Sequence, residues 1–447
     1  MVSYQYPMNK LAQELMNFFT VVVDKEESSA PVLFQRCGVL IRFHIEEIPD
    51  RGDISIANIS KYWEAYCRKQ GRKMRQDTYK EMDLMLPNEA AMQGLIEKAK
   101  DWVFPLQGIT PLYKDRCAFS FHRRPVIAYV LNVVLQQGDR YGHISKSDKA
   151  PTLCLGQSPN TTLDDGTEQL GHYRLSQLRV ITRRLMAYSA WRLVDPDQQS
   201  DDTLRVTVEA QRCPNQPTDH VCLVCGPVLE PVGKTATTMN RDSYLALRSK
   251  DMILMAMHRN GVRMSSSHGD FDGLIQRLGA AAVIVDLFEV RHASAASVVR
   301  NGSGGSKGAS YILYNSARLE RLLRTFNAQV EAGVYQPLPP LDDIDLSLLE
   351  DDLDWKLIYG YLLPFPEVVE STLNLLQQGQ CDVHLLVRYI SSLAAVFSRY
   401  YRQKKILVQM RDQLMPVLYA RVYLIKAVRQ VLNVALSLLG IEPVTYI

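Results

Sequence analysis

The amino-acid sequence predicts a multidomain protein of the α+β and α classes: an N-terminal α+β domain, a reduced Rossmann-like α/β unit and a C-terminal bundle of helices. Three observations predict this fold class. The apolar pattern is mixed at first, then alternates between helix-like and strand-like, and is finally almost wholly helical. Segments rich in Gly, Ser, Thr, Asp and Pro separate the parts at residues 141–171 and 301–308. The predicted domains are residues 1–145, 150–295 and 306–447.

The N-terminal part alternates helix-like and strand-like patterns. Helices are predicted near residues 8–23, 56–71 and 88–102, and a strand-like run covers residues 30–43. The first helix has no basic region or cleavage site of a secretion signal. One of its sides is apolar and carries Leu11, Leu15, Phe18, Phe19 and Val22. This mixture predicts a small α+β domain.

In the middle part, helix and strand patterns follow one another. A helix is predicted over residues 176–191, and strands over residues 203–210 and 220–229. This order is typical of an α/β unit with a parallel sheet.

The C-terminal part is predicted to form a helix bundle. Its helices are expected at residues 311–332, 345–361, 365–378, 385–403 and 413–439. A loop between them carries seven acidic residues from Asp342 to Asp354.

Charge and cysteine content limit the class of protein. The net charge of +3 is too small to indicate a polyanionic partner by itself. Eight cysteines scattered over 447 residues do not form a secreted disulfide framework, so a reducing, cytoplasmic location is expected. No apolar stretch approaches the roughly 18 residues needed to span a bilayer. No contact with a membrane is expected.

A basic stretch in the bundle is the clearest charge signal. Nine Lys or Arg residues and a single acid, Asp412, lie between Arg388 and Arg429. Tyrosines are interleaved with these charges, at positions 389, 400, 401, 419 and 423. Cations attract phosphates, and aromatic rings stack on unpaired bases with about 1–3 kcal/mol each. The stretch therefore indicates either an RNA-binding face or an ordinary solvated basic surface.

Two sets of residues are candidates for RNA contact. Tyr314, Asn315 and Arg318 combine an aromatic ring, an amide and a guanidinium at the start of the first bundle helix. The alternative is that Arg318 pairs with a nearby acid such as Glu320 or Glu331. The second set has two parts. Four residues are candidate phosphate ligands: Arg399, Arg402, Lys404 and Lys405. Three residues share one face of the last helix and are expected near bases: Tyr423, Lys426 and Gln430.

Metal and nucleotide motifs are weak. Cys222 and Cys225 could form half of a zinc site with Cys213 and His220, but their apolar, strand-rich surroundings favour buried strand cysteines. The run NGSGGSKG at 301–308 lacks the Gly-Lys pair of a P-loop and is typical of a linker. No cofactor and no metal are expected.

Several motifs resemble those of one family. YNSARLERLL at 314–323 resembles the start of the DALR anticodon-binding domain of arginyl-tRNA synthetases, and the segment from Ala420 to Pro443 resembles its last helix. Upstream, Gly52, Asp53 and Asn58 match the N-terminal tRNA-binding domain, and SPN at 158–160 resembles the segment before the HxGH signature. The resemblance implies a class I arginyl-tRNA-synthetase-like architecture.

The catalytic signatures of that family are not conserved in this sequence. The two HxGH histidines would fall at Arg174 and Gln177, and the glycine between them at Ser176. Of the KMSKS signature, only Lys234 has a counterpart, in GKTATTMNRDS. In synthetases the signature residues stabilise the phosphates of ATP. Because this sequence has other residues at most of these positions, we expect the protein not to be an enzyme.

A synthetase skeleton with altered signatures is similar to the DALR anticodon-binding domain-containing proteins of animals. That resemblance implies a non-catalytic adaptor that binds arginine tRNAs and partners a tRNA cytidine methyltransferase making 3-methylcytidine in the anticodon loop. Two alternatives are open: a minimal arginyl-tRNA synthetase or related ATP-dependent aminoacyl transferase, and a bundle that serves only protein contacts.

Overall fold

A computed structural model describes most of the chain. The described residues are 7–23, 38–75, 89–112, 115–144, 146, 150–156, 168–211, 220–260, 271–299 and 307–443. Three features of the sequence therefore lie wholly or mainly outside them: the strand-like run up to residue 37, the SPN segment at 158–160 and Cys213.

By its contacts the chain forms two compact units. The first unit comprises residues 1–137, 339–367 and 412–424, and the second comprises 138–338, 368–411 and 425–447. This grouping differs from the three predicted domains, because two pieces of the predicted bundle belong to the first unit. The predicted domain boundaries stay a prediction.

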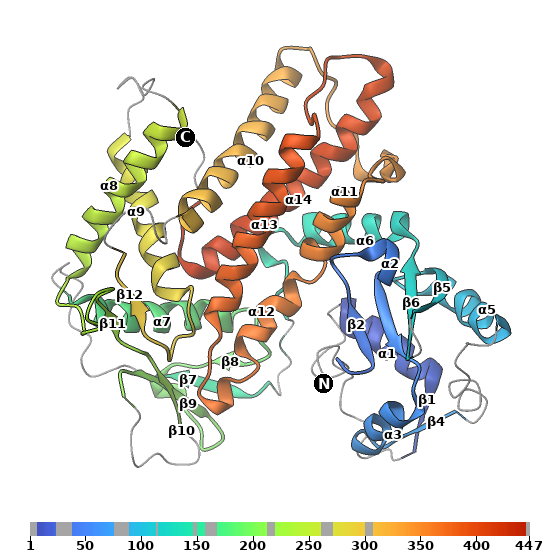
Figure 1. Ribbon diagram of the computed structural model, residues 1–447, viewed down its shortest axis with the longest axis horizontal. Helices are drawn as coiled ribbons and strands as arrows, with labels where there is room; N and C mark the ends of the chain where they lie inside the picture. Colours follow the sequence, from blue (N-terminus) through green and yellow to red (C-terminus); the bar gives the residue numbers. More distant parts are fainter. Residues whose placement is uncertain are drawn as a thin grey trace. The chain divides into compact units, whose positions relative to one another are not determined.

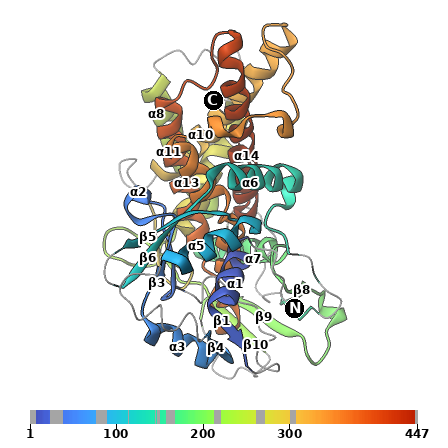
Figure 2. The ribbon, with the colours of Figure 1, turned by 90° about the vertical axis from the view of Figure 1, so that its right-hand side faces the viewer.

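The first unit is built on an antiparallel sheet in the order β2-β3-β6-β5 (Figures 1 and 2). All four residues of β3 are buried, so the sheet is covered on both faces at its centre. In the register, Ile54 faces Phe119 and Ile56 faces Cys117. The strands are β2 Ile41–Phe43, β3 Ile54–Ala57, β5 Leu106–Leu112 and β6 Arg116–Phe121.

Helices and a two-stranded ribbon complete the N-terminal residues of this unit. The predicted helix at 8–23 ends early, because the β-branched run Thr20–Val22 pairs with Arg72–Met74 as strands β1 and β4. The predicted helix at 56–71 begins late, because Ile54–Ala57 is a strand. The helices are α1 Pro7–Phe19, α2 Ile48–Arg51, α3 Ser60–Lys69, α5 Glu89–Lys98 and α6 Arg123–Gln137.

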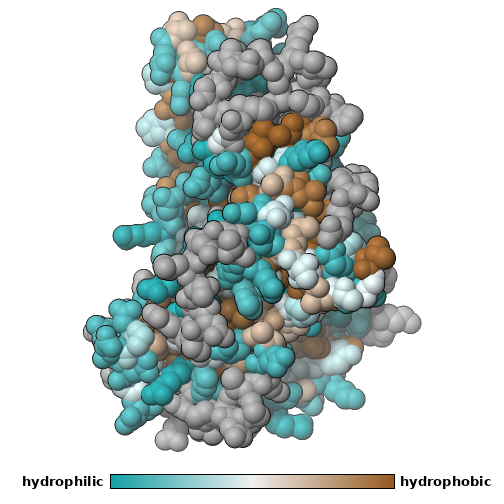
Figure 3. Space-filling view, turned by 90° about the vertical axis from the view of Figure 1, so that its left-hand side faces the viewer, coloured by the Kyte–Doolittle hydropathy of each residue, from teal (hydrophilic) through white to brown (hydrophobic). Residues whose placement is uncertain are grey.

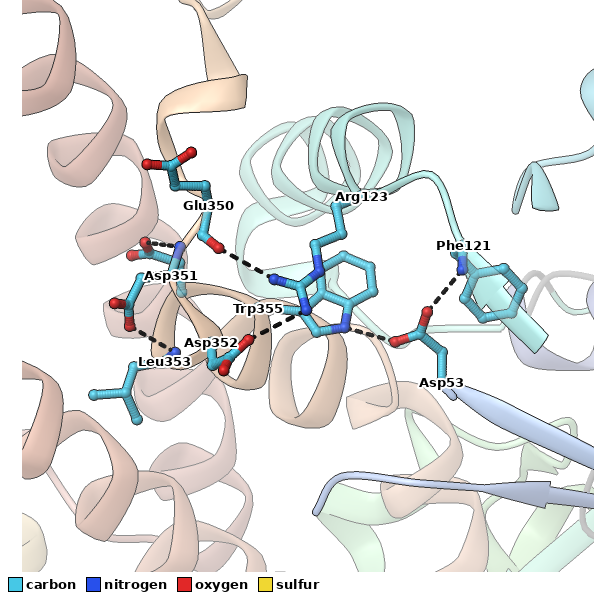
Figure 4. A network of polar contacts seen from close by, with 9 residues as sticks. Asp53, Phe121, Arg123, Glu350, Asp351, Asp352, Leu353 and Trp355 are labelled. Atoms are coloured by element: carbon cyan, nitrogen blue, oxygen red, sulfur yellow. Dashed lines mark hydrogen bonds and ion pairs between the residues drawn. The ribbon is translucent and has the colours of Figure 1, made fainter. Parts of the chain in front are cut away.

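The acidic segment belongs to this first unit and packs on its sheet (Figure 4). Trp355 is fully buried, and its indole Nε1–H donates to Asp53 Oδ1 at 2.8 Å. The other carboxylate oxygen of Asp53 accepts from the backbone of Phe121, and the Tyr359 hydroxyl donates to the Asp53 carbonyl at 2.7 Å. Asp53 is thus an internal anchor.

Arg123 and a capped helix fix the same segment. The Arg123 guanidinium lies 5.3 Å from the Trp355 ring centroid and donates to the Glu350 carbonyl and the Asp352 carboxylate (Figure 4). Helix α11 spans Asp352–Leu357, later than the predicted start at 345. The reason is a capping box, in which Asp351 and Asp354 accept from the first backbone N–H groups.

The second unit contains the predicted parallel sheet, which confirms the α/β class of the middle part. Its order is β10-β9-β7-β8, and α7 lies along one face (Figure 1). The strands are β7 Thr152–Leu155, β8 Arg192–Leu193, β9 Leu204–Glu209 and β10 His220–Val224, and a small parallel pair is formed by β11 Val228–Leu229 and β12 Ala296–Ser297. Helix α7 spans Leu170–Met186.

Two helices, α8 (Arg241–Asn260) and α9 (Phe271–Phe288), pack closely on each other in this unit. A Cβ atom at Gly279 would lie 2.1 Å from the Ser249 hydroxyl, so a larger residue would separate the two helices. On the face that carries α8, apolar side chains gather in patches separated by hydrophilic ones (Figure 3).

The C-terminal helices confirm the predicted bundle. They are α10 Lys307–Glu331, α12 Phe365–Leu373, α13 Val383–Gln403 and α14 Met415–Leu439. Arg318 of α10 contacts Ser398 of α13, and Tyr335 beyond α10 contacts Val408 beyond α13. The contact further along α10 is thus also the contact further along α13. The two helices therefore run in the same direction.

One expectation about membranes needs correction. Among the described residues, the helical stretch from Asp412 to Leu439 is long and apolar enough to span a bilayer by length and composition. However, 72% of its most apolar window is buried. That burial is typical of the core helix of a bundle.

Candidate nucleic-acid interface

The start of α10 brings together the first set of predicted residues. Ile312, Leu313 and Leu319 are buried and fix the inner side of the helix. Tyr314 and Arg318 lie one turn apart and are half-buried, so they share a face next to solvent. Asn315 falls on the inner side.

Asn315 is fully buried, which does not match the prediction that it contacts RNA directly. Its amide Nδ2 donates to the Tyr311 carbonyl at 2.8 Å, and its Oδ1 accepts from Arg318 Nη1 at 3.3 Å. Asn315 therefore orients Arg318 from inside the bundle.

Arg318 lies between two aromatic rings. Its guanidinium carbon is 4.5 Å from the ring centroid of Tyr314 and 4.2 Å from that of Tyr401. Its Nη1 also lies 3.5 Å from the Ser398 hydroxyl. Such cation–π contacts hold a guanidinium without neutralising it.

The alternative in which Arg318 pairs with Glu320 is wrong. Glu320 instead accepts from Arg429 Nε at 3.1 Å. In the described part of the chain, no carboxylate lies within ion-pair distance of Arg318. The positive charge of Arg318 is therefore not compensated by an acid there.

Sequence reasoning named Tyr401 among the interleaved tyrosines but did not choose it as a site residue, and it passed over Ser398. Both lie on α13, three residues apart and therefore on one face. Tyr401 is 37% exposed, whereas Tyr389, Tyr400, Tyr419 and Tyr423 are buried. We name the side chains of Tyr314, Arg318 and Tyr401 the Tyr-Arg-Tyr stack.

The predicted phosphate ligands lie at the end of α13. Arg399, Arg402 and Lys405 are exposed, and Lys404 is half-buried. Arg402 Nε reaches back to the Ser398 carbonyl at 3.3 Å, beside the stack. A group of cations thus adjoins an exposed tyrosine ring and the charge of Arg318.

The three predicted residues of α14 have different surroundings. Lys426 is exposed, but Gln430 uses its amide to donate to Asp139 Oδ1 at 2.8 Å. Tyr423 is buried in the first unit, where its hydroxyl donates to the Pro339 carbonyl at 2.5 Å. Burial and the nearby Asp342 and Asp343 raise the pKa of Tyr423. These contacts favour structural roles for Tyr423 and Gln430.

Arg174, which aligns with the first signature histidine, is fully buried. Its guanidinium donates to backbone carbonyls of Leu287, Gly226, Ser294 and Arg291 at 2.7–3.2 Å. Leu287 lies at the C-terminal end of α9, where a cation interacts favourably with the helix dipole. Arg174 therefore joins α7 to the turn after α9.

The cysteine pair lies in the interior. Cys222 and Cys225 are both buried, and burial raises the pKa of the Cys225 thiol to about 11. His220 bonds to Thr207 instead. Among the described residues, no three or more His, Cys, Asp or Glu side chains are grouped closely enough to hold a metal ion.

Comparisons with known proteins agree with this architecture. Residues 312–447 match the family described as DALR anticodon binding domain. The chain is similar to the DALR anticodon-binding domain-containing protein 3 of Danio rerio, with 28% identity over 50% of this chain and 41% of that protein. It is also similar to the arginine–tRNA ligase of Carboxydothermus hydrogenoformans, with 30% identity over 43% of this chain and 33% of that protein. The matched part thus covers less than half the length of these relatives.

A solved structure shares the fold. The arginyl-tRNA synthetase of Thermus thermophilus superposes with a TM-score of 0.59 at 11% identity, over 98% of this chain and 99% of that one. This likeness confirms the expected synthetase-like fold. The family match itself extends over residues 312–447, the segment that forms the C-terminal helices, and it agrees with the resemblance seen in their sequence.

Proposed function

We propose that this protein is a non-catalytic, cytoplasmic adaptor that binds arginine tRNAs through its C-terminal helices and presents them to a tRNA 3-methylcytidine methyltransferase. The observation that carries the RNA part is the Tyr-Arg-Tyr stack: an uncompensated guanidinium between two rings, beside exposed cations. It lies within the residues that match the DALR anticodon-binding domain.

The chemistry of this surface suits a tRNA loop. Exposed Arg399, Arg402 and Lys405 attract phosphates and would release counterions on binding. Tyrosine rings offer a face to unpaired bases, which a double helix does not present. A loop closed by a stem supplies both phosphates and unpaired bases.

The surroundings of Arg174 support the proposal that the protein is not catalytic. The resemblance to synthetases implies ATP as the second substrate, with a histidine at this position facing its phosphates. Arg174 is completely buried, and backbone carbonyls accept from its Nε and from both of its Nη atoms. This residue does not fit a role in binding phosphate, which supports a protein that forms no adenylate.

The methyltransferase partner rests on the family resemblance. An adaptor without a reaction of its own needs an enzyme to act on the bound tRNA. The DALR anticodon-binding domain-containing protein 3 of Danio rerio shares 28% identity over half of this chain, which supports a common role.

The test is to isolate the tagged protein from cells and sequence the small RNAs and proteins bound to it. We expect arginine tRNAs together with a methyltransferase. A variant carrying Arg402→Glu and Lys405→Glu should lose the tRNAs, whereas Lys250→Glu, an exposed residue of α8, should keep them.

Two results would contradict this proposal. A partner protein without tRNA would favour a bundle that serves only protein contacts. Arginine-dependent exchange between ATP and pyrophosphate would instead favour the minimal synthetase.

A further inference from the structure

We propose that strand β1 is the edge on which the methyltransferase docks, by adding an extended strand of its own that carries apolar and acidic side chains. This inference rests on the proposed function, because it names the surface on which the adaptor receives its enzyme. It concerns the ribbon that β1 and β4 form in the first unit (Figure 2).

Three consecutive valines at this ribbon are exposed. The exposed fractions of Val21, Val22 and Val23 are 39%, 43% and 55%. Because successive side chains of a strand point to opposite faces, water reaches apolar side chains on both faces of β1. Apolar side chains that lie together on a surface mark a site of protein contact, since their burial is favourable.

One edge of β1 is open. The backbone N–H of Val23 donates to the Gly71 carbonyl at 3.0 Å, and that of Arg75 donates to the Phe19 carbonyl at 3.1 Å. Since hydrogen bonding alternates along an antiparallel strand, the backbone groups of Val22 point away from β4. Among the described residues, no strand pairs with β1 on that side. An added strand would bind these groups.

Strand β1 lacks the usual protection of an open edge. Proteins ordinarily place charged residues or prolines on such a strand, which prevents pairing with another chain. The residues Thr20–Val22 include neither. The strand is nevertheless held firmly, because the Thr20 hydroxyl donates to the Met16 carbonyl at 2.6 Å and accepts from Arg72 Nε at 2.7 Å. A fixed edge loses little conformational freedom when a partner binds.

The charges around the ribbon define the chemistry of the partner. Residues 60–75 contain six Lys or Arg side chains and one acid, Glu64. Lys73 lies directly opposite Val21, and Lys98 Nζ lies 5.5 Å from the ring centroid of Phe18. These cations attract an acidic strand, whereas they would repel the basic ribbon of a second copy of this chain.

The same surface suits a protein segment better than RNA. Cations attract phosphates, but valine side chains neither stack on bases nor form hydrogen bonds with them. Arg72 is also used internally, since its Nη2 donates to Asn17 Oδ1 at 2.7 Å. An extended protein segment would use the backbone edge, the valines and the cations together.

The experiment measures the affinity of the full-length protein for the methyltransferase recovered with it from cells, purified and free of RNA. Val22→Pro removes the backbone N–H on the open edge and should weaken binding by about 5- to 100-fold. Val22→Ile keeps the edge and should bind as the wild type does. Val21→Asp should also weaken binding, whereas Val39→Asp, at an exposed valine outside the ribbon, is the matched control and should not.

Three further readouts separate docking from a structural role and from RNA binding. Lys73→Glu should weaken binding of the enzyme and make the affinity less sensitive to salt, because an attractive charge is lost. The affinity of every variant for an arginine tRNA should equal that of the wild type, since the cations of α13 remain. Thermal unfolding should not change, because the substituted side chains are exposed.

The outcomes are distinguishable. Wild-type protein that carries tRNA but no methyltransferase would overturn the partner in the proposed function, and this inference with it. Equal binding of the enzyme by the wild type, Val22→Pro and Val21→Asp would overturn the docking inference alone and leave the adaptor proposal standing. Variants that lose tRNA and keep the enzyme would show that the ribbon contacts RNA, which would also overturn the inference.

Discussion

Two arginines of the second unit, Arg174 and Arg318, show how the same side chain serves different purposes. Arg174 is completely buried, with carbonyl acceptors for its nitrogens. Arg318 is half-buried, held mainly by ring faces, and its Nη1 has side-chain partners at 3.3 Å and 3.5 Å. An arginine whose donors are used by the backbone stabilises the fold, whereas one held by its faces keeps its charge for a ligand.

The largest expected effect is on stability at Arg174. Arg174→Ala would leave several buried carbonyls without donors, so we expect the free energy of unfolding to fall by about 3–5 kcal/mol. Urea denaturation measures this loss. Arg179→Ala, at a half-buried position of the same helix, is the control and should cost much less. An unchanged unfolding midpoint for Arg174→Ala would mean that the carbonyl contacts do not stabilise the unit.

The second effect is on RNA binding near Arg318. Removing two phosphate ligands with Arg402→Ala and Lys405→Ala should lower tRNA affinity by about tenfold or more and reduce the slope of log K against log salt by about 1.4–1.8. Titrations at several salt concentrations measure both. Stability should not change, since both side chains are exposed. An unaltered slope would place the phosphate contacts elsewhere.

A smaller effect on both properties is expected at Asn315, which connects the stack to the bundle interior. Asn315→Ala removes its bonds to Tyr311 and Arg318, so the free energy of unfolding should fall by about 1–2 kcal/mol. Affinity for tRNA should fall less than in the variant with Arg402→Ala and Lys405→Ala, because the rings and the exposed cations remain. A variant with full stability and lost binding would indicate that Asn315 contacts RNA directly after all.

The smallest expected effect is a dependence of the protein's stability on pH. It arises at His292, on the Arg174 side of the comparison. His292 accepts from the Cys381 backbone at Nε2, so Nδ1 carries the hydrogen and donates to the Val224 carbonyl at 2.7 Å. Burial lowers the pKa of His292, and also that of His384 nearby.

A histidine whose folded-state pKa is lowered stabilises the protein when neutral. That stability is fully present above the unfolded pKa of about 6.5 and is lost as the pH falls below it. Thermal unfolding at pH 8 and pH 5.5 should show the decrease, and His292→Gln should reduce it. A stability that rises on acidification would contradict the neutral state assigned to His292.

Much of the fold was predictable because it depends on local patterns. The periods of α10, α13 and α14 and the alternation of α7, β9 and β10 are visible in short windows of sequence. The predicted bounds were wrong where a segment that fits a local pattern pairs with a strand far along the sequence. The run Thr20–Val22 continued the apolar pattern of α1, but it pairs with a strand some 50 residues away.

The candidate site was predictable only in part. Tyr314 and Arg318 follow from the motif at the start of α10, but sequence alone does not tell which neighbouring helix covers Asn315. The contact of Tyr401 with Arg318 joins residues 83 positions apart, and the carbonyls around Arg174 come from two separate segments, at Gly226 and at residues 287–294. Such contacts depend on how the helices and strands pack together. The spacing of residues along the sequence does not reveal this packing.

The anchoring of Trp355 and Tyr359 on Asp53 also has a consequence for biosynthesis. The first unit needs residues 339–367 and 412–424, so a ribosome that has made residues 1–137 has made only part of it. At about 5–20 residues per second, Trp355 follows on the order of 10–45 seconds later. During that interval Asp53 lacks its indole partner and the apolar surface that Trp355 covers stays open. We therefore expect chains released before Trp355 to be targets of chaperones and proteases even though their N-terminal sheet strands are all present.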